Sequence, residues 1–99
     1  MKYDLKDNLN FLQKATNRIF KLLPSREEGA NWELPLQTLI EEFAGYYHIN
    51  LDHQDKIFLL ICKMEGLFIL TKEEDFLMFR KTIFECLSLL NELVLLCQN

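Results

Sequence analysis

The sequence predicts an all-α domain arranged as a compact, four-helix bundle-like fold. Leucine accounts for 20 of the 99 residues whereas valine occurs once, and β-branched residues are scarce. Helices favour leucine, lysine, glutamate and glutamine, while strands favour β-branched and aromatic side chains. The eight phenylalanines are the feature of the composition that argues for strands. Four segments with helical spacing of apolar residues give the number of helices.

The first predicted helix covers residues 4 to 23. Its apolar stripe repeats at alternating four- and three-residue steps and consists of Leu5, Leu9, Leu12, Thr16, Ile19 and Leu23. Asp4 and Asp7 lie near its start, where negative charge is favourable. We expect the helix to stop before Pro24, because the next eight residues, PSREEGAN, are polar and contain both proline and glycine.

The second predicted helix spans residues 34 to 47. Pro35 suits its first turn because the missing N–H would have no partner there, and Asn31 and Glu33 lie just upstream as capping or dipole-matched residues. Its apolar residues are Leu36, Leu39, Ile40, Phe43 and Tyr47. The pattern weakens at Gly45 and ends in the stretch HINLDH.

The stretch from Ile57 to Leu70 allows two structures. As a helix capped by Asn50 or Asp52, it carries Gly66 in its interior at a cost of about 1 kcal/mol. That cost is small beside the roughly 1.5–3 kcal/mol gained for each large apolar side chain that is buried. The alternative is a β-hairpin turning at Glu65-Gly66, which would make the domain mostly α and winged-helix-like. Glutamate is a poor residue for that turn, so the sequence favours a third helix, covered on several sides.

A fourth helix is predicted to begin at Thr71 and Glu74, which fit a capping box. An apolar heptad seam follows, made of Phe76, Phe79, Ile83, Cys86, Leu90, Leu93 and Cys97. Further leucines lie outside this seam, and three neighbouring helices have difficulty covering all of them. Either the helices cover each other, or Leu89, Leu93, Leu95 and Leu96 form a surface for self-association or for another protein.

Charge is unevenly distributed along the chain. Residues 1–26 hold six Lys/Arg and two Asp, a net charge of +4, and residues 27–99 hold five basic and thirteen acidic residues, a net charge of −8. The basic side chains Lys14, Arg18, Lys21 and Arg26 form a predicted ridge on the first helix. Such a ridge fits nucleic acid or an acidic partner. The sequence favours the other interpretation, a solvated face paired with acidic helices of the same bundle.

Trp32, Tyr46 and Tyr47 form an aromatic group in and before the second helix. Tryptophan and tyrosine often anchor protein interfaces, so these residues are candidate anchors for a partner. Core packing, with a hydroxyl group at the rim of the core, is the role that the sequence favours for the same side chains.

Length and cysteine content indicate one domain over residues 1–99 in a reducing compartment. Cys62, Cys86 and Cys97 are odd in number and lie in apolar runs, unlike a secreted disulfide framework. The N-terminal residues have no apolar signal-peptide core, and no segment is apolar enough to cross a membrane. We therefore expect a cytoplasmic protein without a membrane span.

The sequence carries no recognisable catalytic apparatus. It has three glycines, no phosphate-binding or nucleophile motif, and two histidines, His48 and His53, at a spacing that does not suit one helical face. We expect no catalytic residue, metal site, cofactor or small-molecule substrate. The expected function is a non-enzymatic accessory subunit, regulator or inhibitor that binds another protein or itself as a homodimer. A nucleic-acid-associated module is the alternative.

Overall fold

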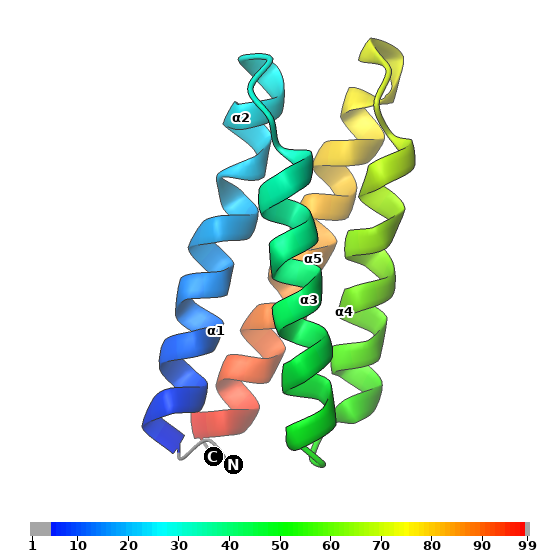
Figure 1. The fold of residues 1–99 in the computed structure, drawn as a ribbon. Helices are drawn as coiled ribbons and strands as arrows, with labels where there is room; N and C mark the ends of the chain where they lie inside the picture. The colour runs from blue at the N-terminus through cyan, green and yellow to red at the C-terminus, as the bar shows by residue number, and fades with distance from the viewer. Residues whose placement is uncertain (1–4, 99) are drawn as a thin grey trace.

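The computed structural model describes residues 5–98, which form helices and short connections without a strand (Figure 1). The side chain of Leu5 and the predicted helix start at Asp4 lie outside the described part. The elements are α1 (Leu5–Phe20), α2 (Leu22–Glu27), α3 (Glu33–Ile49), α4 (Gln54–Gly66), the 3₁₀ turns η1 (Leu67–Ile69) and η2 (Glu73–Asp75), and α5 (Phe76–Gln98). The predicted all-α bundle is confirmed.

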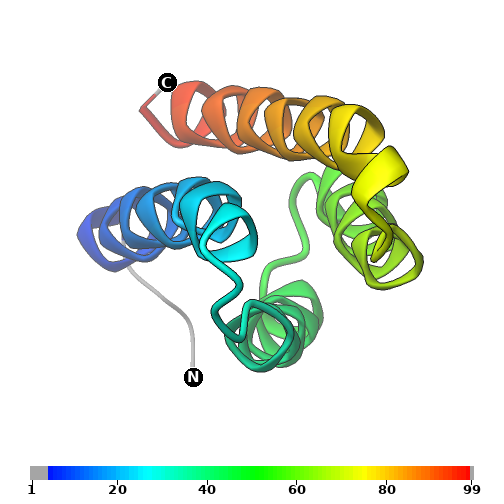
Figure 2. The same cartoon turned by 90° about the horizontal axis from the view of Figure 1, so that it is seen from above.

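The helices run up, down, up and down, with α2 continuing the direction of α1 (Figure 1). Seen along the bundle, they stand at four corners (Figure 2). α5 packs against α1 and α4, and α3 packs against α4 and more sparsely against α1. The bundle therefore has four seams, one between each pair of adjacent helices. The α1·α5 seam lies opposite the α3·α4 seam.

The predicted stop before Pro24 is wrong, because the chain stays helical to Glu27. Proline lacks the N–H that would bond to the Phe20 carbonyl, and its ring crowds that carbonyl. The result is a break at Lys21 rather than an end. The helix ends instead at Gly29, which has a φ of 75°. There the Ala30 N–H donates to the Ser25 carbonyl at 2.9 Å and the Gly29 N–H to the Arg26 carbonyl at 3.2 Å, a Schellman ending.

Asn31 caps α3 as predicted. Its Oδ1 accepts hydrogen bonds from the N–H groups of Glu33 and Leu34, at 3.1 and 3.2 Å. α3 passes through Gly45 and continues to Ile49, two residues beyond the predicted end.

Neither Asn50 nor Asp52 caps α4, contrary to the prediction. The Asn50 Oδ1 accepts the Asp52 N–H at 3.1 Å and closes the turn before the helix. His53, with a left-handed φ of 61°, is the residue immediately before α4.

The ambiguous stretch around Gly66 is helical, so the hairpin alternative is excluded. α4 runs to Gly66, whose φ is −63°, and η1 follows directly. The predicted capping box at Thr71 and Glu74 is misplaced by one residue. The observed bond runs from the Lys72 N–H to the Asp75 Oδ2 at 3.2 Å, and the single turn η2 precedes α5.

The core lies on the axis of the bundle and is built from all four corners. The predicted heptad seam of α5 supplies five buried residues, while its end members Phe76 and Cys97 are half-buried. Trp32, just before α3, and Leu89 of α5 are also buried. The remaining buried side chains come from α1, α2, α3, α4 and η1, and include Leu12, Ile19, Leu36, Phe43, Ile57, Leu60, Met64 and Leu67. No polar or charged side chain of the described residues is fully buried.

One bidentate ion pair joins α1 to α3. Both terminal nitrogens of Arg18 donate to the Glu42 carboxylate at 2.9 Å. These hydrogen bonds lower the pKa of Glu42 below its ordinary value of 4.5 and raise the pKa of Arg18. A carboxyl group with a lowered pKa in the folded state stabilises it above the unfolded pKa, and this contribution is lost as the pH falls through the folded pKa.

We expect Glu42→Gln to lower the free energy of unfolding at pH 7 by about 1 kcal/mol or less, because both groups are partly exposed. Urea denaturation of wild type and variant at pH 7 measures this difference. The difference should shrink at acidic pH, where Glu42 is protonated in the wild type as well. An unchanged difference at both pH values would show that the charge of Glu42 is not its source.

Candidate functional site

The predicted leucine surface of α5 is largely not a surface. Leu89 and Leu93 are buried in the core, and Leu96 is half-buried beside Asn8, Asn50 and His53. Leu95 alone of the four is exposed. The reason is that α5 is contacted by α1 on one side and α4 on the other, which widens the part of its circumference that is covered. The four leucines therefore do not form one continuous docking surface.

Two of the three predicted aromatic anchors belong to the core instead. Trp32 is buried, with its ring 5.0 Å from Phe79 in an edge-on arrangement. Tyr46 is also buried, and its ring centre lies 4.8 Å from that of Phe11. Tyr47 is half-buried at the α3·α4 seam. Neither Trp32 nor Tyr46 is available to a partner in this fold.

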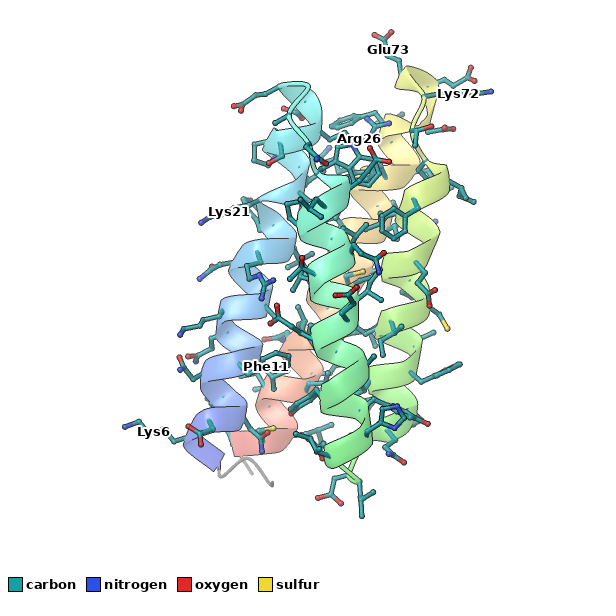
Figure 3. All side chains as sticks on the ribbon, viewed as in Figure 1. Lys6, Phe11, Lys21, Arg26, Lys72 and Glu73 are labelled. Carbon is teal, nitrogen blue, oxygen red and sulfur yellow. The ribbon has the colours of Figure 1, made fainter. Side chains whose placement is uncertain are left out.

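Arg26, at the end of the predicted ridge, holds the upper end of the bundle together (Figure 3). Its Nη2 donates to the carbonyl oxygens of Leu70 and Lys72 at 2.9 and 2.7 Å. Its guanidinium also lies over the Phe79 and Phe76 rings, 4.8 and 5.4 Å from their centres. These contacts tie α2 to the connection before α5, so Arg26 has an intramolecular role.

The remaining ridge residues divide in two. Arg18 is bound to Glu42, whereas Lys14 and Lys21 are exposed and form no ion pair with a described residue. Lys6 lies on the same outer side of α1, and both Lys6 and Lys21 project away from the bundle (Figure 3). Of the predicted ridge, only Lys14 and Lys21 therefore remain available to a partner. Together with Lys6 we call them the lysine stripe.

The clearest candidate contact surface lies on the outside of α4. Phe58 and Leu59 are 57% and 47% exposed. Cys62, about one helical turn further along α4, is exposed as well. These positions are i, i+1 and i+4, so they share one side of the helix, opposite the buried Ile57, Leu60 and Met64. We call Phe58, Leu59 and Cys62 the α4 face.

Neighbouring helices fix the two edges of the α4 face. On the α3 side, the Phe58 ring lies 6.3 Å from the ring of Tyr47, and Gln54 Nε2 donates to the Tyr47 carbonyl at 2.9 Å. On the α5 side, Lys56 and Lys63 flank Leu59 by one helical turn. Each is paired across the seam at 3.3 Å, with Glu92 and Glu85 respectively. The face is therefore held on a rigid element.

Carboxylates surround the α4 face. Asp55 and Glu65 lie on the same side of α4 as Cys62, Asp52 precedes the helix, and Glu41 lies on the outer side of α3. All four are exposed, and none forms an ion pair with a described residue. We call these four residues the acidic rim. An apolar strip inside a rim of one charge fits a partner with apolar side chains and basic neighbours.

The α4 face was missed because the stretch 57–70 was expected to be covered on several sides. The sequence does indicate apolar residues on both sides of this helix. Ile57 and Leu60 lie on one side, and their neighbours Phe58 and Leu59 lie on the other. A surplus of apolar side chains was correctly predicted but was assigned to the longer C-terminal helix. Which side of a helix is left uncovered depends on how the helices pack together. The spacing of apolar residues within one helix does not determine that packing.

The three thiols differ sharply in environment. Cys62 is exposed on the α4 face, whereas burial raises the pKa of Cys86 to about 12. Burial also raises the pKa of the half-buried Cys97, opposed by a hydrogen bond with Tyr46. The thiolate is the reactive form, so the raised pKa values of Cys86 and Cys97 disfavour their reaction, whereas Cys62 is accessible to a reagent.

We expect a thiol reagent such as DTNB to modify Cys62 first in the folded protein at pH 8. Cys97 should follow more slowly and Cys86 only on unfolding, because its thiol is both enclosed and uncharged. Peptide mapping after timed quenching identifies each site. Equal modification of Cys62 and Cys86 in folded protein would contradict the burial described here.

An open depression of about 780 Å³ lies at the Arg26 end of the bundle. Trp32 and Phe76 contribute aromatic surface, and Glu27, Glu73 and Glu74 contribute carboxylates. The Phe76 ring is already covered by Arg26. Within residues 5–98 no group of three or more His, Cys, Asp or Glu side chains could hold a metal ion. None of the described helices is long and apolar enough to cross a membrane.

Comparison with known proteins found no relative for this chain: no protein-family model, no curated protein and no solved structure matches it. The features of the molecule that bear on its function are the α4 face, the acidic rim and the lysine stripe.

Proposed function

We propose that the chain is a small, cytoplasmic, non-catalytic protein-binding module, an accessory subunit, regulator or inhibitor, and that it binds through the α4 face. The observation that carries this proposal is the exposure of Phe58, Leu59 and Cys62 on one side of a well-packed helix. Exposed apolar patches on soluble proteins commonly mark interaction sites. A phenylalanine in such a patch is the kind of side chain that fills a pocket on a partner.

The geometry fits a helix-binding surface. The face is a strip along α4, which is 13 residues and therefore about 20 Å long at 1.5 Å per residue. A partner helix with apolar residues at i, i+3, i+4 and i+7 would match its length. Basic residues beside that apolar stripe would meet the acidic rim, which raises specificity and the rate of association more than affinity.

The test is stoichiometric co-purification with the tagged wild type and two variants. Phe58→Lys removes the phenylalanine of the α4 face and adds a positive charge that repels a basic partner. Leu34→Lys is the matched control, because Leu34 is 65% exposed but lies at the opposite end of α3 from Tyr47. We expect wild type and Leu34→Lys to retain a partner that Phe58→Lys loses by at least about tenfold, 1.4 kcal/mol. Equal recovery with all three proteins would contradict the proposal.

The second candidate function is binding of nucleic acid through the lysine stripe of α1. Lys6, Lys14 and Lys21 are exposed, project from one side and have no described ion-pair partner. Clustered lysines supply the salt-dependent part of nucleic-acid binding. Overall acidity counts against this candidate, since the net charge is −4.

Fluorescence anisotropy with single-stranded and duplex DNA and RNA at low salt tests this candidate. Binding that weakens steeply with salt and is lost in the double variant Lys14→Glu, Lys21→Glu would favour it. Absence of binding at low salt with both nucleic acids would remove it.

A further inference from the structure

The four seams of the bundle carry different charge. Arg18 and Glu42 neutralise each other across the α1·α3 seam. Lys56 with Glu92 and Lys63 with Glu85 do the same across the α4·α5 seam. These two seams lie opposite each other, and all three described ion pairs lie on them.

The outer side of α1 and the adjoining side of α5 are mainly basic. Four exposed cations there have no described ion-pair partner, namely Lys6, Lys14 and Lys21 of α1 and Arg80 of α5. The spacing of seven residues places Asp7 on the same side of α1 as Lys14 and Lys21. Lys81, Glu85 and Glu92 of α5 lie together on the side toward α4.

The same side also exposes aromatic surface. Phe20 is one helical turn beyond Thr16, which lines the α1·α5 seam with Leu87. Phe84 is one turn before Leu87, and the Arg80 guanidinium lies 5.6 Å from the centre of its ring. Both phenylalanines are about half exposed. We call Phe20 and Phe84 together with these four cations the basic face.

The basic face and the α4 face are complementary, and their helices α1 and α4 stand at opposite corners of the bundle (Figure 2). One has exposed aromatic side chains among four unpaired cations, and the other has exposed apolar side chains inside a rim of four unpaired carboxylates. We propose that a second copy of this chain binds the α4 face with its basic face. This proposal rests on the proposed function of the α4 face and names its partner.

The placement of the two faces determines the assembly. Two different surfaces meet in this contact, so it is heterologous and leaves one free basic face and one free α4 face at the ends of every open assembly. Further copies can add at both ends. The result is a ring or an open stack rather than a two-fold dimer. Nucleic acid bound to the basic face would compete with this stacking.

The test is the mass in solution of wild type and two single-face variants, from sedimentation and from gel filtration with light scattering. Phe58→Lys blocks the α4 face and Phe84→Asp blocks the basic face, each by a charge that repels the opposing face. Circular dichroism and thermal melting establish that both variants are folded. Each variant keeps one intact face, and these two faces are the complementary ones.

We expect the wild-type mass to rise by about twofold or more with concentration at low salt, and to fall in about 1 M salt, where charges are screened within about 3 Å. Each variant alone should remain a monomer. An equimolar mixture should form a complex of two chains and nothing larger, because its outer faces are both blocked.

Three results would overturn the stacking contact. They are a wild type that stays monomeric at high concentration and low salt, a variant that still assembles alone, and a mixture that remains monomeric or grows beyond two chains. A monomeric wild type that still retains a different protein through Phe58 would overturn stacking and leave the proposed function standing.

Discussion

Phe79→Ala should destabilise the bundle by about 3–5 kcal/mol, a large share of the roughly 5–15 kcal/mol typical of a domain. Phe79 is fully buried, and its ring contacts Trp32 at 5.0 Å and lies 4.8 Å beneath the Arg26 guanidinium. Truncation removes all of these contacts and leaves a cavity where α2, η1 and α5 meet. The Arg26 bonds to the Leu70 and Lys72 carbonyls would lose their aromatic support.

Urea denaturation followed by circular dichroism measures this loss. The matched control is Phe84→Ala, five residues away on the same helix, whose side chain is 44% exposed. The control should cost about 1 kcal/mol or less, since little of its area is enclosed. Similar losses for the two variants would mean that α5 is rotated relative to the orientation described here.

Leu93→Asp should prevent stable folding at 25 °C, with a loss above about 4 kcal/mol. Leu93 is 2% exposed and faces the bundle axis. The substitution removes a large buried apolar side chain and forces a carboxylate into a core without polar partners. Leu93 is therefore unsuitable as a probe of partner binding, although the sequence predicted it as a contact residue.

Leu95→Asp isolates the effect of burial, because Leu95 is 51% exposed and only two residues further along α5. Helix propensity and the interaction with the helix dipole are nearly the same at the two positions. We expect Leu95→Asp to change the melting temperature by a few degrees at most. Thermal unfolding of both variants measures the contrast, and a cooperative, wild-type-like transition for Leu93→Asp would contradict the packing of α5.

The fold could be predicted because helix formation is recorded in local spacing. The heptad positions of α5 point at the axis, Asn31 caps α3, and Gly66 remains inside a helical turn. Errors occurred where two local signals competed. Pro24 broke the helix without ending it, and Asp75 rather than Glu74 accepted the N-terminal hydrogen bond of the turn before α5.

The candidate site could be predicted only in kind. A surplus of apolar side chains was evident, but Leu89 and Leu93 are covered and Phe58 and Leu59 are not. α4 and α5 each contact two neighbouring helices, so exposure depends on which residues of a helix face those neighbours. That orientation results from long-range packing, and no spacing within a single helix determines it. Which basic residues are paired also depends on long-range packing, since the partner of Arg18 lies 24 residues away.

Alkylation of Cys62 in living cells tests most directly whether the α4 face is a contact surface. Cys62 is the exposed thiol of this face, so any partner or second copy that covers Phe58 also shields it. Mass spectrometry of cells that naturally make the protein compares its modification rate with that of dilute purified protein. We predict a rate in cells at least about tenfold lower, restored by Phe58→Lys. Equal rates in both settings would contradict a binding role for this face.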